Sequence, residues 1–154
     1  MELSSLLSPE GVRAGLKTTS KKRLLQDVAG LAHGTLGLAE DAVFDALQAR
    51  EQLGPTGMGR GVAVPHARLA GLERMHGLFL RLDKAVAFGA VDGQPVDLVF
   101  ALLAPDSASA EHLKALARVS RTLRDERICA KLRSTEDPAA LYAILTEPTA
   151  SEAA

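Results

Sequence analysis

The run VDLVFALLAP, residues 96–105, constrains the fold more than any other part of the sequence. Apart from Asp97 the run is apolar, and Pro105 closes it. A strand with one face in water alternates between apolar and polar residues, whereas a strand covered on both faces is apolar almost throughout. The run therefore predicts a central strand with other structure packed on both of its sides.

The remaining pattern predicts the helices that would cover this strand. The segment HGLFLRLD, residues 76–83, alternates and predicts a half-buried strand, and VAV at residues 62–64 predicts a short buried one. Residues before 20 give only a short amphipathic start. We expect Ser20 to cap a first helix that Gly34 ends, and Asp137 and Pro138 to begin a last one. The predicted helices span residues 20–34, 39–54, 109–123, 124–133 and 137–147.

This order of helices, strands and helices predicts a single α/β domain with a mixed sheet and helices on both faces. We expect the domain to cover residues 1–148 and the last residues, 149–154, to form a flexible tail. In the helix over residues 109–123 we expect Leu113, Leu116, Ser120 and Leu123 to share the inner stripe.

Composition excludes several classes of function. The chain has 154 residues, with 18 Lys plus Arg against 19 Asp plus Glu, so its charge balance gives no case for binding nucleic acid or an anionic membrane. The N-terminal residues do not resemble a signal peptide, and the longest apolar run is too short to cross a bilayer. The single cysteine, Cys129, is expected in the core of a cytoplasmic protein. The basic residues 21–23 are expected to form a solvated face.

The stretch GVAVPHARL, residues 61–69, holds the strongest candidate for chemistry. Pro65 stops the apolar strand and holds His66 at its end. The glycine-rich loop of residues 54–61 comes before the strand, and its backbone N–H groups can form an anion-binding concavity. No Gly-Lys-Ser/Thr follows, so the loop is not a P-loop, and it leads into a strand, so it is not a dinucleotide fingerprint either. The local residues alone leave a functional and a structural role for His66 equally open.

Two further residues join this candidate site. Arg50 lies near the inner face of its predicted helix, where a guanidinium needs a partner. His112 falls in the first turn of the helix after the central strand, where Ser107 or Ser109 can serve as cap and the helix N-terminus attracts anions. A neutral imidazole is a good nucleophile toward phosphorus, and arginine neutralises phosphoryl charge. His33 and His76 are expected to be structural, and the four histidines have no metal-ligand spacing.

Three separated blocks also resemble a known family: AREQLGPTGMGRGVAVPHARL, FGAVDGQPVDLVFALLAP and EHLKAL. They are similar to the enzyme IIA (EIIA) domains of the bacterial phosphoenolpyruvate phosphotransferase system (PTS), above all to the nitrogen-regulatory branch, a relative of the fructose and mannitol types. The likeness covers nearly the whole chain. It departs from the family pattern at Ala67, where glycine is frequent, and at Lys114, where some relatives have a second histidine.

The resemblance implies a three-layer α/β/α sandwich with a mixed β-sheet, and phosphorylation of His66 with Arg50 and His112 as its active-site partners. The donor would be a histidine-containing phosphocarrier protein. We expect Thr56, Gly57 and Gly61 to help bind the phosphoryl group, without metal or cofactor. An apolar rim of Met58, Val62 and Val64 is a candidate docking surface. The regulatory targets, by family analogy potassium transport or a sensor kinase, cannot be identified from the residues.

Two alternatives remain at this point. The chain carries no fused permease and has an N-terminal segment like that of the regulatory branch, yet a sugar-specific enzyme IIA that passes phosphate to a permease would use the same chemistry. A binding module that no longer transfers phosphate would act on partners by contact alone.

Overall fold

The computed structural model describes residues 2–108 and 110–147. Its strands are β1 (Leu7–Leu16), β2 (Gly57–Gly59), β3 (Val62–Ala63), β4 (His66–Leu69), β5 (His76–Val86) and β6 (Val96–Pro105). Its helices are the 3-10 turn η1 (Leu3–Ser5) and α1 (Lys21–Leu36), α2 (Glu40–Gln52), α3 (Ala110–Arg124), α4 (Glu126–Arg133) and α5 (Pro138–Thr146).

The strands form one mixed sheet in the order β1-β5-β6-β3-β2, and β4 also pairs with β6. β6 runs antiparallel to β5 but parallel to β3 and β4, while β1 runs parallel to β5. The predicted central strand is therefore confirmed, with the predicted bounds. Because β6 has neighbours on both edges, it holds the short strands around His66 against the body of the sheet.

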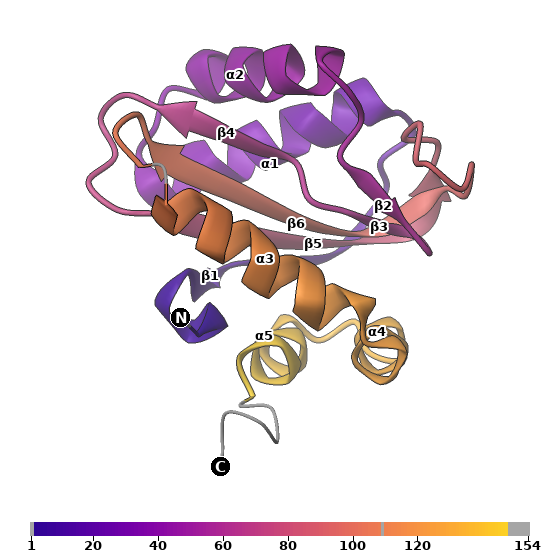
Figure 1. Cartoon of the computed structure of the whole chain (residues 1–154). Coiled ribbons are helices and arrows are strands. Elements are labelled where there is room, and N and C mark those ends of the chain that lie inside the picture. The colour runs from indigo at the N-terminus through magenta and orange to yellow at the C-terminus, as the bar shows by residue number, and fades with distance from the viewer. Residues whose placement is uncertain (1, 109, 148–154) are drawn as a thin grey trace.

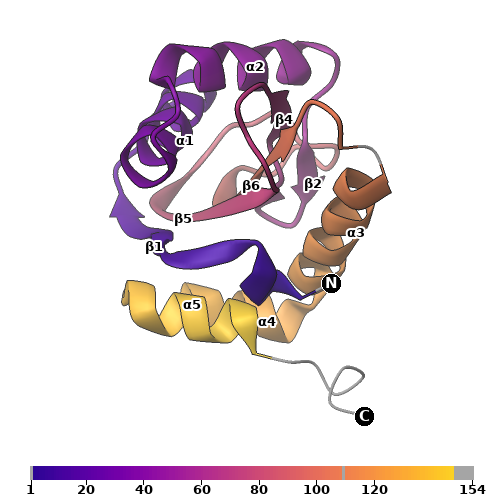
Figure 2. The same cartoon turned by 90° about the vertical axis from the view of Figure 1, so that its left-hand side faces the viewer.

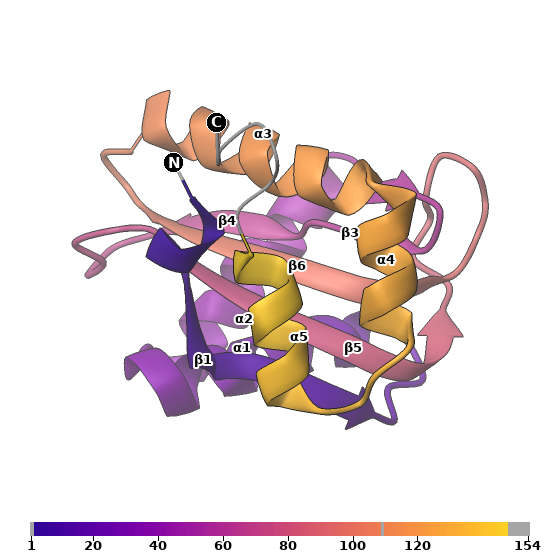
Figure 3. The ribbon, with the colours of Figure 1, turned by 90° about the horizontal axis from the view of Figure 1, so that it is seen from below.

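Helices cover both faces of this sheet, as predicted. α1 and α2 lie on one face, and α3, α4 and α5 lie on the other (Figures 1 and 2). Seen from the second face, α5 lies across β1 and β5 with α4 beside it, while α3 runs along the sheet (Figure 3). The molecule is thus the three-layer α/β/α sandwich with a mixed sheet that the sequence led us to expect.

The apolar run of β6 divides its side chains between two cores. Val99, Ala101 and Leu103 pack with the core under α1 and α2, whereas Phe100 and Leu102 pack with the core under α3, α4 and α5. Each set follows the alternation of side chains along a strand. This explains physically why the run has no polar face.

Several boundaries differ from the predictions. The amphipathic start is β1, an edge strand whose pairing with β5 is irregular between Leu7 and Val12, which hides its alternation. α1 continues past Gly34 to Leu36 and ends at Gly37, which has the left-handed backbone (φ 71°) of a helix C-cap. β5 is not half-buried, because Phe79 lies in the core under α3 while Leu78 and Leu80 lie in the other core.

Other local predictions hold. Ser20 accepts a hydrogen bond from the Arg23 N–H at the start of α1, and Asp137 caps α5 with Pro138 in its first turn. Cys129 is buried in the core, where its thiol donates to the Leu123 carbonyl. Within the described residues, no helix is both long and apolar enough to span a membrane. The predicted tail, residues 149–154, and Ser109 as a cap lie outside the described residues.

Candidate active site

His66 is the first residue of β4, directly after a break in the pairing along β6. β3 pairs with β6 through Ala63, and pairing resumes at His66 opposite Leu102. Pro65 stops the first strand, as expected, but His66 begins a new strand instead of ending the old one. Ala67 and Leu69 point into the core under α1 and α2, so His66 and Arg68 lie on the other side of β4.

The hydrogen bonds of His66 determine its tautomer. Its Nδ1 lies 2.9 Å from the Val64 carbonyl oxygen, which only accepts, so Nδ1 carries the proton. Nε2 is then the unprotonated nitrogen, and it accepts a hydrogen bond from Arg50 Nε at 3.2 Å. Burial lowers the pKa of His66 and Arg50 lowers it further, against the opposing effects of the Val64 hydrogen bond and the Glu51 charge. The ring is thus held neutral with one nitrogen free to react.

Arg50 lies in the last turn of α2 and is fixed by two contacts. Besides its bond to His66, its Nη1 donates to the Gly54 carbonyl at 2.9 Å. The loop that carries Gly54 is itself tied down by Glu51, which is only 8% exposed. Glu51 accepts hydrogen bonds from the N–H and the hydroxyl of Thr56 and pairs with Lys21 at 3.0 Å. The guanidinium is therefore positioned before any ligand arrives.

Lys22 and Arg23 are exposed, as expected for the solvated face predicted over residues 21–23, but Lys21 departs from that expectation. Its ammonium pairs with buried Glu51 and lies 4.4 Å from the centre of the Phe88 ring. A basic residue at the start of a helix opposes the helix dipole, so its partners explain its position better than solvent does.

His112 lies in the first turn of α3, as predicted, and is only 6% exposed. Its ring centre is 5.4 Å from that of His66, with the two planes nearly perpendicular. Arg68 Nε donates to His112 Nδ1 at 3.4 Å, while Nε2 is buried with no hydrogen-bond partner among the described residues. Burial lowers the pKa of His112, and the neighbouring His66 and Arg68 lower it further.

These side chains share an open pocket between α2 and α3, which we call the His66 pocket. Its volume is about 510 Å³. Two large apolar side chains on its walls are exposed, Leu53 at 84% and Leu113 at 69%. Leu113 was predicted on the inner stripe of its helix, but the buried positions of α3 are His112, Ala115, Val119, Thr122 and Leu123. The pocket is lined by Ala46, Ala49, Arg50, Leu53, His66, Ala67, Arg68, His112, Leu113 and Leu116.

Comparison with known proteins agrees with the resemblance noted in the sequence. Residues 5–147 match the model of a family described as the phosphoenolpyruvate-dependent sugar phosphotransferase system, EIIA 2. The chain belongs to this EIIA family. Its fold is thus that of a PTS component, and the PTS EIIA family is a phosphotransferase component.

Several relatives of this chain are nitrogen regulatory proteins. One from Bradyrhizobium diazoefficiens is 50% identical over 99% of this chain and 100% of its own length. Another from Escherichia coli is 42% identical over 96% of this chain and 91% of its own length. The crystal structure of nitrogen regulatory protein IIA-Ntr from Neisseria meningitidis, 37% identical, superposes with a TM-score of 0.88 over 94% of this chain and 99% of that one.

The residues predicted for this EIIA site divide into two groups. Arg50, His66 and His112 all line the pocket. Thr56, Gly57 and Gly61 do not: Thr56 is bonded to Glu51, Gly57 lies against Ala90, and Gly61 lies beside Asp97 and Arg133. The suggested docking rim does not form, because Val62 and Val64 are buried in the core and Met58 packs against it.

The pocket also contains Arg68, which the sequence analysis did not select. The signal was its position two residues after His66, which places both on the same side of a strand. The other histidines lie elsewhere: His33 is bonded to the Leu38 carbonyl and His76 begins β5. Across the residues that the structure describes, no cluster of three or more His, Cys, Asp or Glu is arranged to hold a metal ion.

Proposed function

We propose that the chain is a phosphohistidine carrier of the nitrogen-related PTS, which accepts a phosphoryl group on Nε2 of His66. One observation carries the proposal: His66 donates its Nδ1 proton to Val64 and so presents an unprotonated Nε2 beside Arg50. A nucleophile needs a free lone pair, and a transferred phosphoryl group needs a neighbouring cation.

The reaction we propose is balanced without any proton transfer on His66. The donor is the phosphohistidine of a histidine-containing phosphocarrier protein. The Nε2 lone pair forms the new N–P bond while the donor N–P bond breaks and its electron pair returns to the donor imidazole. The proton stays on Nδ1 throughout and remains hydrogen-bonded to the Val64 carbonyl. Arg50 then turns its N–H groups from Nε2 to the phosphoryl oxygens, and His112 supplies a further donor.

We further propose that the phosphorylation state of His66 regulates partner proteins in the cytoplasm. A phosphoryl group adds about −1.5 to −2 charges at neutral pH. On this chain it would appear between Leu53 and Leu113, two exposed apolar side chains that a partner can contact. A partner that docks on these apolar side chains would therefore meet a strongly negative group when His66 is phosphorylated and a neutral imidazole when it is not. The regulatory role is favoured over sugar transport because the relatives reported above are nitrogen regulatory proteins.

Intact mass spectrometry tests the proposal. The wild type, His66→Ala and His33→Ala are incubated with phosphoenolpyruvate, enzyme I and the phosphocarrier. We expect one acid-labile phosphoryl group on the wild type and on His33→Ala, and none on His66→Ala. NMR of the labelled ring should then place phosphorus on Nε2. Phosphorylation that persists in His66→Ala would refute the assignment of His66 as the acceptor. A wild type that accepts nothing from any phosphocarrier would favour a pure binding module.

A further inference from the structure

The two histidines of the His66 pocket are held as opposite tautomers. In His66 the engaged atom is Nδ1, which donates to a carbonyl, so Nε2 has no proton. In His112 the engaged atom is also Nδ1, but it faces Arg68 Nε, which only donates. His112 Nδ1 must then accept, and the proton of the neutral ring is on Nε2. Nε2 is thus unprotonated in His66 and protonated in His112.

We propose that Arg68 is a positioning residue, which holds His112 neutral with its proton on Nε2 so that this N–H donates to the phosphoryl group on His66. The proposal rests on the function proposed above. It gives the phosphoryl group a hydrogen-bond donor, the Nε2–H group of His112, which is buried and has no partner in the described residues. Such an unpaired buried polar atom is costly unless a ligand satisfies it.

The charges around His112 support this assignment. Within the His66 pocket the charged or titratable neighbours are Arg50 from α2 and His66 and Arg68 from β4. On α3 itself, Glu111 and Lys114 flank His112 and are exposed. Arg68 and His66 both lower the pKa of His112, in addition to burial. A second proton on His112 would have to sit on Nδ1, directly facing the Arg68 guanidinium, so Arg68 opposes both the charged ring and the other tautomer.

The consequence for transfer follows from the ring geometry. If the proton moved to Nδ1, the bare Nε2 lone pair of His112 would meet the anionic phosphoryl oxygens and repel them. Because Nδ1 of His112 accepts a hydrogen bond from Arg68, moving the proton to Nδ1 would break that hydrogen bond. The bonds formed and broken in the transfer are those given above, and the proton of His112 stays on Nε2.

The test compares Arg68→Met, which keeps most of the side-chain length without a donor, with Arg68→Lys, which keeps one charged donor. Arg13→Met is the matched control, because Arg13 is an exposed arginine on β1 outside the pocket. The first readout is ¹⁵N NMR of the His112 ring in the unphosphorylated protein, which reports which nitrogen is protonated and at what pH the ring titrates. The second is the rate of phosphorylation by phosphoramidate, a small donor that needs no docking.

We expect Arg68→Met to raise the titration midpoint of His112 and to populate its Nδ1–H form, with Arg68→Lys intermediate and Arg13→Met like the wild type. Phosphorylation should slow roughly five- to tenfold in Arg68→Met, the loss of about one hydrogen bond. An unchanged ring pattern and midpoint would overturn the proposal, and so would an unchanged rate. The NMR readout needs no phosphorylation, so a wild type that accepts no phosphate would reject the proposed function separately.

Discussion

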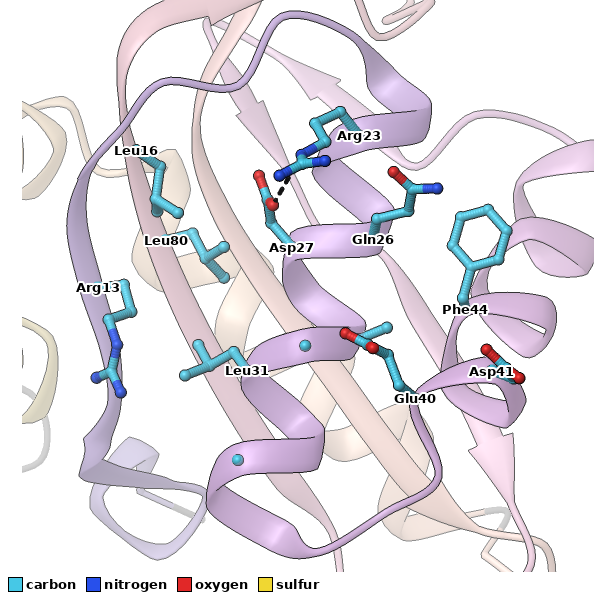
Figure 4. Close-up of a pocket in the computed structure, with 13 residues that line it drawn as sticks. Arg13, Leu16, Arg23, Gln26, Asp27, Leu31, Glu40, Asp41, Phe44 and Leu80 are labelled. Carbon is cyan, nitrogen blue, oxygen red and sulfur yellow. Dashed lines mark ion pairs between the residues drawn. The ribbon is translucent and has the colours of Figure 1, made fainter.

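The His66 pocket and a larger hollow on another side of the molecule differ in how their polar groups are satisfied. The larger hollow, about 640 Å³ in volume, lies where α1 meets β1 and the start of α2, and we call it the α1 hollow (Figure 4). Its charged groups are either paired or exposed to solvent. Arg23 pairs with Asp27, which also accepts from Thr18, and Arg13 donates to backbone carbonyls. Glu40 and Asp41 are exposed. The His66 pocket, though smaller, contains an unprotonated imidazole nitrogen beside Arg50 and a buried N–H without a partner among the described residues.

The difference teaches that unsatisfied polar atoms locate chemistry better than cavity size does. The floor of the α1 hollow is apolar, with Leu16, Leu31 and Leu80, and on its rim Arg23 is already paired with Asp27 (Figure 4). In the His66 pocket burial and neighbouring cations push the pKa of both histidines down, which keeps both rings neutral where an anion is to bind. The predictions below test this contrast.

Removing one arginine from each site should give the largest contrast. Arg50→Ala should slow phosphorylation of His66 by about 10²–10³-fold, the usual cost of losing one preorganised donor to a transition-state anion. Arg23→Ala in the α1 hollow should leave the rate unchanged, because the Arg23 guanidinium pairs with Asp27 and does not line the His66 pocket. Rates are measured with the phosphocarrier and again with phosphoramidate. Equal rates for both variants would mean that the contrast between the two sites has no bearing on transfer.

The pH dependence of phosphorylation should be the next largest effect. His66 reacts only when neutral, and its pKa lies below 6.5 because burial and Arg50 disfavour the charged ring. The rate with phosphoramidate should therefore fall with a midpoint below pH 6.5, and drop about tenfold per pH unit below the lowered pKa. In Arg50→Ala one cause of the shift is gone, so the drop should begin at a higher pH. A wild-type midpoint at or above 6.5 would contradict the neutral, desolvated ring.

The lowered pKa values of the two histidines also make the stability of the folded protein depend on pH. A histidine whose pKa is lower in the folded state than in the unfolded chain binds fewer protons when folded. Its contribution to stability is complete above pH 6.5 and is lost as the pH falls toward the folded-state pKa. His66 and His112 act in the same direction, so mild acid should weaken the site before it unfolds the rest of the sheet.

The sequence predicted the parts of this site whose local pattern carries the information. The apolar run of β6, the Pro-His step at His66 and the first-turn position of His112 are local features, and all three are present, although His66 begins β4 instead of ending β3. Their packing into one pocket came from the family resemblance, since residues 50, 66 and 112 are brought together only by the sheet order.

The parts that were missed depend on tertiary contacts. Arg68 gains a role only because α3 crosses near β4, and Glu51 only because Lys21 and Thr56 reach it from other segments. The glycine loop looked like an anion site, but Gly61 lies against the Arg133–Asp97 ion pair instead of the pocket. β1 was missed because an irregular edge strand lacks the alternation that marks a strand. Gly34 was predicted to end α1 because, in the sequence, any glycine near the end of a helix resembles a C-cap.

The smallest predicted effect comes from Gly34→Ala, which would add a methyl group inside the α1 hollow. Gly34 lines the hollow, has helical backbone, and an added Cβ there would meet no atom within 4 Å. Gly34→Ala should stabilise the protein by about 0.5–1 kcal/mol through helix propensity, which raises Tm by about 1–4 °C. Gly37→Ala, at φ +71°, should instead cost about 1 kcal/mol. Thermal unfolding of both variants gives the comparison. Phosphorylation of Gly34→Ala should match the wild type, because a change that narrows the larger hollow leaves Arg50, His66 and His112 where they are.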